Sequence, residues 1–406
     1  YWKVFTNEEI GITNTEISCF AEDQDGNIWI GTFSSELIKY DGSNWRIYDT
    51  LKSLLPEVDI WTISVDSMNN KWIGTKGNVG GLVKFDEIDW TVYNLNEYGI
   101  QGTSIFDIEI DKEGNLWLGT YWDGLVKYDG IDFIIYNHAT SGLDQNMEEI
   151  NSLVIDDSGH IWIGSDAVGV AKFDGVSEWV HYYNSDNTVD FAVYSIEIDY
   201  EGNVWFGGVW FISQFDGESE WTQYDYADDG SWYTDIIVDS NKTIWFTSWS
   251  KGFLKLSYSD GEVWNKYTPY GFIELENEGC WAAFKDSKGN YWIGYNNGYI
   301  AVYNPDGITS ILEIEPFLPS DYTLSQNYPN PFNPSTTIKY SLPKNSYVSL
   351  KIYDVLGKEV TVLVDEEKAV GNYKVEFNAN NLSSGVYFYR IQAGEFVDIK
   401  KLVLMK

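Results

Sequence analysis

Short apolar segments with a period of two residues recur along the first three quarters of the chain, and turn residues separate them. In each unit a first segment, such as 105–110, leads into an Asp turn, and a second segment is centred on Trp. A third segment usually ends in Lys-Tyr-Asp or Lys-Phe-Asp, and a fourth carries Trp-x-x-Tyr or a close variant. Alternation of this kind predicts β-strands. Four strands in each unit of roughly 44 residues predict one blade of a β-propeller.

The unit occurs seven times, and each copy contains Trp followed two residues later by Gly, or by Thr in the sixth copy. An Asp lies six residues before every Trp, and its carboxylate is expected to accept local backbone N–H bonds in a type I turn. The Trp positions are Trp29, Trp72, Trp117, Trp162, Trp205, Trp245 and Trp292. The Asp positions are Asp23, Asp66, Asp111, Asp156, Asp199, Asp239 and Asp286. We therefore predict an all-β, seven-bladed propeller whose Trp residues pack between blades.

The N-terminal segment is predicted to close the ring. The fourth-strand pattern is missing from the seventh unit, and the front of the chain supplies it as Trp2-Lys3-Val4-Phe5. Pairing this segment with the last blade would remove an exposed sheet edge. The propeller is therefore predicted over residues 1–311.

Two cysteines occur, Cys19 and Cys280, on the first strands of the first and last blades. These blades become neighbours when the ring closes. A disulfide between the two would clasp the ring and stabilise it in the chain-entropy model. Two free buried thiols are the other interpretation, and the sequence leaves both open.

The charge balance bears on the kind of partner that the protein can bind. The chain has 62 acidic and 26 basic residues, a net charge of −36, which disfavours nucleic acid as a partner.

The three histidines and two cysteines show no metal-ligand spacing, so we expect no metal site. Apolar runs are too short for a transmembrane segment. The numbering begins at Tyr1, and we expect a signal peptide to have been removed.

Ca²⁺ is the one cofactor that a motif suggests. Residues 23–27 read Asp-x-Asp-Gly-Asn, the beginning of a calcium-loop pattern. The following Trp strand leaves no place for the bidentate Glu that such a loop requires. We therefore expect turn chemistry and no cofactor, with Ca²⁺ as the minor alternative.

No nucleophile elbow, phosphate loop or dinucleotide motif occurs, so we predict no enzyme. First-strand residues two and four positions before the Asp row should lie nearest the central channel, as a solvated lining or a cation site. They include Asp107, Glu109, Glu197 and Asp235, beside Thr62, Ser64, Ser152 and Ser195. A row of lysines on the third strands is expected to pair with nearby acids. These are Lys39, Lys84, Lys127, Lys172 and Lys255.

Aromatic residues gather on the loops between second and third strands, which should open on one face of the disc. They are Phe33, Tyr121, Trp122, Trp210, Trp249 and Tyr295. Aromatic side chains in such positions stack on sugars, anchor a protein partner, or roof the blades. We take them as the candidate ligand-binding residues.

The blade sequence resembles a known repeat. Asp111–Gly130 reads DKEGNLWLGTYWDGLVKYDG, which is similar to the two-component-regulator type propeller repeat. The resemblance covers residues 1 to about 310 and implies the propeller fold. In that family the repeats form extracytoplasmic sensors of hybrid histidine kinases that often bind oligosaccharides. This chain contains no kinase or DNA-binding segment, so the signalling role is not implied.

The tail carries a second resemblance. Its motifs are Ser325–Pro334, Leu342–Pro343, Lys351–Gly357, Ser384–Arg390 and Lys400–Lys406. In this order they resemble the type A C-terminal sorting domain of type IX secretion. The resemblance implies an immunoglobulin-like β-sandwich over 326–406, preceded by a linker at 312–325. It also implies type IX machinery as a partner, a Bacteroidetes-like source, and a location outside the cell or on the outer-membrane surface. The tail would be cleaved, exchanged for a lipid anchor, or retained.

Two functional hypotheses follow. The first is a non-catalytic structural or adhesive component of extracellular material that acts through protein–protein contacts or self-association. The second is a glycan- or protein-binding module that uses the aromatic-rimmed face. A carbohydrate-active enzyme is the least favoured, because carboxylates alone do not define one.

Overall fold

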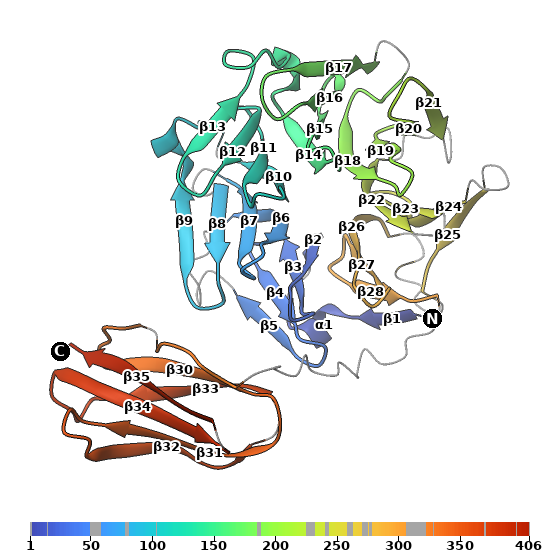
Figure 1. Cartoon of the computed structure of the whole chain (residues 1–406). Helices are drawn as coiled ribbons and strands as arrows, with labels where there is room; N and C mark the ends of the chain where they lie inside the picture. Colours follow the sequence, from blue (N-terminus) through green and yellow to red (C-terminus); the bar gives the residue numbers. More distant parts are fainter. Residues whose placement is uncertain are drawn as a thin grey trace. The chain divides into compact units, whose positions relative to one another are not determined.

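The computed structural model describes residues 2–305 and 322–405, with gaps at 14, 49–57, 78–80, 103, 185–187, 225–231, 240–242, 258–262, 270–274, 276–277, 328, 369–370 and 395. The chain divides into two units, Tyr1–Leu312 and Glu313–Lys406. In the described part of the first unit, seven four-stranded antiparallel sheets surround a common axis like blades (Figure 1). The predicted all-β class, a propeller followed by a β domain, is confirmed.

The strands of each blade follow one another from the centre outward. Blade 1 contains β2 (Ile17–Glu22), β3 (Ile28–Thr32), β4 (Leu37–Tyr40) and β5 (Trp45–Tyr48). Blade 2 contains β6 (Asp59–Val65), β7 (Lys71–Lys76), β8 (Gly81–Phe85) and β9 (Trp90–Asn94). Blade 3 contains β10 (Ile105–Ile110), β11 (Leu116–Thr120), β12 (Leu125–Tyr128) and β13 (Phe133–Tyr136). Blade 4 contains β14 (Ile150–Ile155), β15 (Ile161–Ser165), β16 (Gly169–Phe173) and β17 (Trp179–Tyr183).

The remaining blades complete the ring. Blade 5 contains β18 (Val193–Ile198), β19 (Val204–Gly208), β20 (Ile212–Phe215) and β21 (Trp221–Tyr224). Blade 6 contains β22 (Tyr233–Asp239), β23 (Thr243–Ser248), β24 (Gly252–Ser257) and β25 (Val263–Tyr267). Blade 7 contains β26 (Cys280–Lys285), β27 (Tyr291–Tyr295), β28 (Ile300–Tyr303) and β1 (Trp2–Phe5). Short helices α1 (Asn7–Ile10), η1 (Leu95–Tyr98) and η2 (Gln145–Met147) lie in the connections.

The N-terminal strand joins the two ends of the propeller. β1 pairs antiparallel with β28, which places Trp2 opposite Tyr303 and Phe5 opposite Ile300. Phe5 also packs against Tyr40 of blade 1, with ring centroids 5.5 Å apart. The outer edge of blade 7 is therefore covered by a strand from the other end of the unit.

Among the described residues, the Asp of the repeat holds the first hairpin of six blades, and in blade 6 Asp239 binds Lys285 and Tyr291 of blade 7. In blade 1, Oδ1 of Asp23 accepts the backbone N–H groups of Asp25 and Asn27, at 3.0 and 2.9 Å. Oδ2 accepts the indole N–H of Trp29 at 2.7 Å. The sequence predicted the turn but not the indole bond, which fixes the six-residue spacing. The same bond joins Trp72–Asp66, Trp117–Asp111, Trp205–Asp199 and Trp292–Asp286.

Blade 4 departs from this pattern. Asp156 lies 3.2 Å from the ammonium of Lys172 and 3.1 Å from Nδ1 of His160. Among the described residues, Nε1 of Trp162 has no hydrogen-bond partner. The Trp ring is still buried, so its packing does not depend on the indole bond.

The lysine row stacks on the Trp row. Lys39 lies opposite Trp29 in the register, and its ammonium is 5.0 Å from the centroid of that ring. A cation over an indole face is attracted by the ring quadrupole. The other four pairs, at 4.9 to 5.3 Å, are Lys84–Trp72, Lys127–Trp117, Lys172–Trp162 and Lys255–Trp245. Three of the lysines also approach the Asp row, at 3.9 Å (Lys39–Asp23), 4.0 Å (Lys127–Asp111) and 3.2 Å (Lys172–Asp156).

The second unit is built from two sheets around one core. One sheet contains β29 (Thr323–Leu324), β30 (Ser335–Leu342) and β33 (Gly371–Asn378). The other contains β32 (Glu359–Lys368), β31 (Ser346–Tyr353), β34 (Gly385–Ala393) and β35 (Phe396–Leu404). Burial alternates along β30 and β31, as expected for strands with one face on a core. Residues 312–321 of the predicted linker lie outside the described residues, and β29 shows that the linker prediction extends too far.

The first tail motif is tied to the last strand. Oδ1 of Asn330 accepts the backbone N–H of Val403 at 2.8 Å. Asn327 is buried, and its backbone N–H donates to the hydroxyl of Tyr389 at 2.8 Å. Asn327 and Asn330 therefore form hydrogen bonds with Tyr389 of β34 and with the backbone of Val403 in β35.

Candidate binding site at the channel mouth

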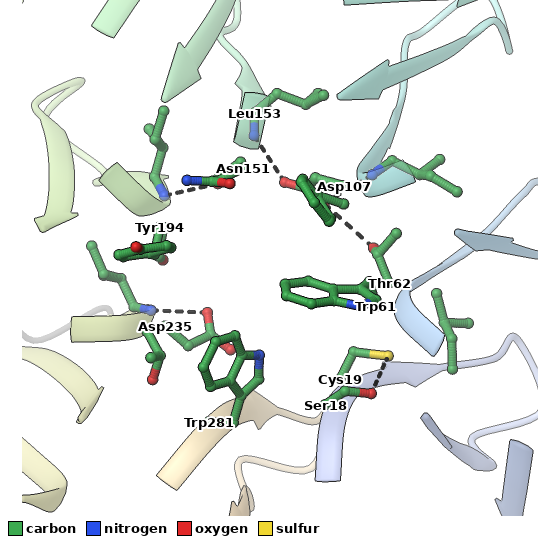
Figure 2. A pocket seen from close by; sticks show the side chains of 18 of the residues that line it. Ser18, Cys19, Trp61, Thr62, Asp107, Asn151, Leu153, Tyr194, Asp235 and Trp281 are labelled. Carbon is green, nitrogen blue, oxygen red and sulfur yellow. Dashed lines mark hydrogen bonds between the residues drawn. The ribbon is translucent and has the colours of Figure 1, made fainter. Parts of the chain in front are cut away.

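The innermost strand of every blade contains a β-bulge, which directs one side chain toward the centre of the ring. In blade 2 the register shifts between Ile60 and Thr62, so Trp61 has no opposite residue on β7. Bulges re-aim side chains in this way. The seven bulge residues, which we call the collar, are Ser18, Trp61, Phe106, Asn151, Tyr194, Thr234 and Trp281. All seven line the central cavity (Figure 2).

Collar rings and one loop ring form a first aromatic cluster. The centroid of Trp61 lies 4.7 Å from Phe106 and 5.7 Å from Trp281. Phe33, in the loop between β3 and β4, packs 5.0 Å from Trp61 and 5.4 Å from Trp281. This predicted residue therefore supports the collar.

Blade 3 extends this cluster outward. The ring of Tyr121 lies 5.7 Å from Phe106 and 4.5 Å from Trp122. Trp122 is 63% exposed, so the chain of ring contacts ends at the surface. We call this side of the propeller, where the loops between second and third strands open, the mouth face.

A second cluster lies on blades 5 and 6. The collar residue Tyr194 stacks on Trp232 at 5.5 Å, and Trp232 lies 5.9 Å from Trp249. Trp249 is 48% exposed. The structure thus connects two of the predicted surface aromatics, Trp122 and Trp249, to collar residues.

The two other predicted residues, Trp210 and Tyr295, do not belong to these two clusters. Trp210 is 53% exposed, and its backbone N–H donates to Asp190 at 2.5 Å. Tyr295 is fully buried and packs in the core of blades 6 and 7 with Cys280. The expectation that Tyr295 lies at the rim is wrong, because β27 extends through this residue and places it between the sheets.

Beneath the collar lies a cavity of about 250 Å³ that contains acidic groups. The residues that the sequence placed near the channel, Asp107, Glu109, Glu197, Asp235, Thr62, Ser64, Ser152 and Ser195, all line it. The carboxylate of Asp107 accepts the backbone N–H of Leu153 in the next blade at 2.8 Å. Asp235 accepts that of Ala283 at 3.0 Å. These two carboxylates therefore bind blade 3 to blade 4 and blade 6 to blade 7.

The cavity raises the pKa of its carboxyl groups. Burial raises the pKa of Asp107 to about 6 and that of Asp235 to about 7. Burial, followed by the charges of Asp235 and Asp107, raises the pKa of Glu197 to about 8. Burial and the neighbouring acids raise the pKa of Glu109 as well. Among the described residues that line the cavity there is no Lys, Arg or His.

These pKa values predict a pH dependence. The folded protein binds protons at these carboxyl groups more tightly than the unfolded chain does. The resulting contribution to the free energy of unfolding is complete below about pH 4 and is lost as the pH rises through about 6 to 8. Glu197→Gln should therefore raise the free energy of unfolding by roughly 2 kcal/mol at about pH 8.5 and change it little at about pH 4, where both states of the wild type are protonated. Denaturant unfolding at both pH values measures this. Glu218→Gln, an exposed acid of the same blade, is the control. An equal gain at both pH values would show that Glu197 does not titrate in this range.

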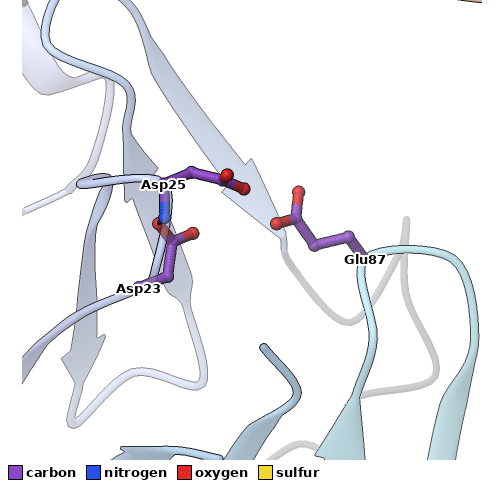
Figure 3. Close-up of side chains that lie close together, drawn as sticks. All are labelled: Asp23, Asp25 and Glu87. Atoms are coloured by element: carbon purple, nitrogen blue, oxygen red, sulfur yellow. Dashed lines mark hydrogen bonds between the residues drawn. The ribbon is translucent and has the colours of Figure 1, made fainter. Parts of the chain in front are cut away.

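A second acidic cluster lies at the rim of blades 1 and 2, where Asp23, Asp25 and Glu87 bring carboxylate oxygens together (Figure 3). The ammonium of Lys71 lies 2.9 Å from Glu87 and 3.6 Å from Asp23. Lys39 lies 2.6 Å from Glu87. Two ammonium groups thus occupy the place that a cation would take. The arrangement agrees with turn chemistry for the Asp-x-Asp-Gly-Asn segment, and Ca²⁺ binding there stays an untested alternative.

Of the two interpretations that the sequence left open, the structure shows free thiols at both Cys19 and Cys280. Cys19 follows the bulge of its strand and packs against Ile60 of blade 2. Cys280 precedes the bulge and packs against Trp245 and Phe253 of blade 6. The bulge reverses the side on which a residue lies, so the two thiols face away from the interface between blades 7 and 1. Burial raises the pKa of Cys19 to about 12 and keeps it protonated.

Comparison with known families agrees with both resemblances. The family described as two component regulator propeller matches residues 11–34 and 99–122. The secretion system C-terminal sorting domain matches residues 326–405. The chain combines two-component-regulator propeller repeats with a type IX sorting domain. The sorting domain directs the protein to the cell surface or the extracellular space and engages the secretion machinery.

Solved propellers share the fold at low identity. The extracellular domain of a hybrid two-component system from B. thetaiotaomicron matches with a TM-score of 0.64 and 17% identity, over 99% of this chain and 57% of that one. PorZ, a surface component of the type IX secretion system of Porphyromonas gingivalis, matches with a TM-score of 0.57 and 18% identity, over 98% and 60%. A catalytically inactive virginiamycin B lyase from Staphylococcus aureus, crystallised with quinupristin, matches with a TM-score of 0.60 and 12% identity. The match covers 74% of this chain and 99% of that one.

At these identities the likeness shows the fold alone. This chain spans less than two thirds of the length of the first two proteins. No curated protein matches it in sequence. Among the described residues, no helix combines the length and the apolar character needed to cross a membrane.

Proposed function

We propose that this secreted propeller is a non-catalytic binding module, which holds an extracellular glycan or protein against the mouth face. The observation that carries the proposal is the pair of aromatic clusters that run from collar residues to exposed indoles, one to Trp122 and the other to Trp249. Exposed indoles beside a concave opening supply large, rigid contact area for sugar rings or for a protein anchor. The two comparison propellers from B. thetaiotaomicron and Porphyromonas gingivalis, named as an extracellular domain and as a surface component, agree with this setting.

Two observations support the absence of catalysis. The lyase structure is a histidine-to-alanine variant named as inactive, so a histidine matters in that enzyme. The three histidines here, His138, His160 and His181, all lie outside the cavity lining. The carboxylates of Asp107 and Asp235 accept backbone N–H groups from neighbouring blades, a structural use of both acids. A carbohydrate-active enzyme is therefore less favoured than a binding module.

The mouth face can be tested with a matched pair of variants. Trp122→Ala combined with Trp249→Ala is expected to weaken binding to immobilised polysaccharides or peptides by about tenfold or more, because exposed indoles are typical anchors. The control is Tyr200→Ala, which removes a 77% exposed aromatic from the turn between β18 and β19. That turn lies at the other end of the first strand, away from the mouth face.

The readout is the amount of labelled protein retained on each immobilised ligand, with thermal melting as a check on folding. The proposal requires that the double variant melts like the wild type while it loses retention, and that the Tyr200 variant keeps it. Equal loss in both variants, or loss in neither, would contradict a binding site on the mouth face.

A structural or adhesive role is the second candidate. It is favoured by the outermost strand β35 of the sorting domain, where Val397 and Ile399 are exposed. Apolar side chains on an edge strand promote contacts between chains. This role predicts that native extracellular protein is polymeric and still carries the sorting domain. Monomeric protein without the tail would exclude it.

A further inference from the structure

The channel beneath the collar combines aromatic rings at its mouth with carboxyl groups below. Four acids, Asp107, Glu109, Glu197 and Asp235, line a cavity of about 250 Å³. This volume corresponds to about eight water molecules at roughly 30 Å³ each. A narrow chain of methylene groups would fit into such a space, whereas a sugar ring system would be confined to the mouth.

A cation already lies on the collar. The ammonium of Lys76 is 4.7 Å from the ring centroid of Trp61 and 5.3 Å from that of Phe106. These distances are typical of cation–π contacts. The collar rings therefore attract an alkylammonium group of the chain itself, which acts as an internal analogue of a cationic ligand.

One carboxyl group in the channel has no hydrogen bond within the described part of the chain. Asp107 and Asp235 are held by backbone N–H groups, and Glu109 is bonded to the backbone of Ile110. For Glu197, burial and the charges of Asp235 and Asp107 shift the pKa of the carboxyl group, and no hydrogen bond contributes. Its oxygens therefore offer acceptor positions to a ligand that enters the channel.

We propose that the channel receives the primary alkylammonium end of a ligand, such as a lysine side chain. The collar surrounds the methylene stem, and the carboxylates, Glu197 first among them, accept the N–H groups. This inference rests on the proposed function, because it names the chemical class that the same mouth face binds. A primary ammonium fits better than a quaternary one, since it carries three N–H donors for the carboxylates.

The electrostatics of the lining support this class of ligand. The titratable groups that face Glu197 from the surrounding strands are Asp107, Glu109, Asp235, Cys19 and Tyr194. Burial raises the pKa of the Cys19 thiol to about 12 and also raises the pKa of the Tyr194 hydroxyl, so both stay neutral near pH 8. A bound ammonium would favour the ionised carboxylates and release protons. Affinity should therefore increase from about pH 6 to about pH 8.5, while the amine itself stays charged.

The test uses the full chain and three small probes of the same stem: n-butylammonium, n-butanol and butyltrimethylammonium. Saturation-transfer NMR in about 150 mM salt screens the surface charge. The expected result is that n-butylammonium binds about tenfold more tightly than n-butanol and more tightly than the quaternary probe. Glu197→Gln should weaken n-butylammonium about fivefold or more, and Glu218→Gln, with the same change of charge on the surface of that blade, should not.

Equal binding of butanol and butylammonium would overturn the inference, as would an unchanged affinity of the Glu197 variant. No butylammonium signal up to about 100 mM would overturn it too. These results would leave the proposed function standing if the Trp122 and Trp249 double variant still lost retention on immobilised ligands. Glu197→Gln is expected to fold, because it removes a charge from a cavity without a counter-ion.

Discussion

Replacing Trp205 with alanine is expected to lower the free energy of unfolding by about 3–5 kcal/mol. Trp205 is fully buried in the core of blades 5 and 6. Its indole N–H also donates to Asp199 at 2.9 Å, and the variant leaves that buried carboxylate without this donor. Cavity formation and an unsatisfied polar group therefore act in the same direction. Urea unfolding followed by circular dichroism measures the change.

The same blade supplies the control for this variant. Trp210→Ala removes an equally large ring that is 53% exposed, and it should cost less than about 1 kcal/mol. The buried Trp row is structural if the two variants differ by several kcal/mol. Similar losses for Trp205 and Trp210 would contradict the assignment of the repeat Trp to the cores between blades.

Deletion of residues 1–5 is the second change with a large expected effect. It removes β1, exposes the edge of β28 and takes Phe5 out of a core that includes Trp292. We expect a loss of more than about 4 kcal/mol and association of the chains, because an unpaired β-edge is a template for intermolecular pairing. Chemical unfolding and light scattering together measure both effects.

Lys3→Gln is the matched control for the deletion. It keeps the backbone pairing of β1 with β28 and changes only a cation that lies 4.3 Å from the ring of Phe5. This variant should remain monomeric with nearly the stability of the wild type. A deletion variant that is as stable and monomeric as the Lys3 variant would mean that β1 does not close the ring.

The sequence predicts the parts of this fold that depend on local spacing. The interval of six residues between Asp23 and Trp29, repeated seven times, is enough to define the blades, because the turn and the following strand are continuous in the chain. The sorting domain is predicted on a different ground, the resemblance of its motifs and their order to a known family. The final blade required one non-local inference, the pairing of Trp2 with Tyr303.

The collar could not be derived from strand alternation, because a bulge interrupts the alternation at that residue. Trp61 is nevertheless five residues before Asp66, and every collar residue has this position relative to its own Asp. That regular position is the signal that strand reasoning missed. The bulges also explain why the two thiols do not meet, since Cys19 follows the bulge of its strand and Cys280 precedes the bulge of its own.

The location of Tyr295 depends on a strand end. The sequence placed this residue in a loop, yet β27 continues to it and buries its ring, whereas in blade 3 the strand β11 ends at Thr120 and frees Tyr121 and Trp122. Strand ends vary by one or two residues between repeats, so loop membership is the least predictable property of a repeated blade.

A density map of the full chain with its captured ligand would show directly which face of the propeller binds. The ligand is the glycan or peptide that the wild-type protein retains in the immobilised-ligand experiment. We expect ligand density on the mouth face, in contact with Trp61 or Trp281 of the collar, with any amine directed toward Glu197. Density around Tyr200 on the opposite face, or on the sorting domain, would contradict it.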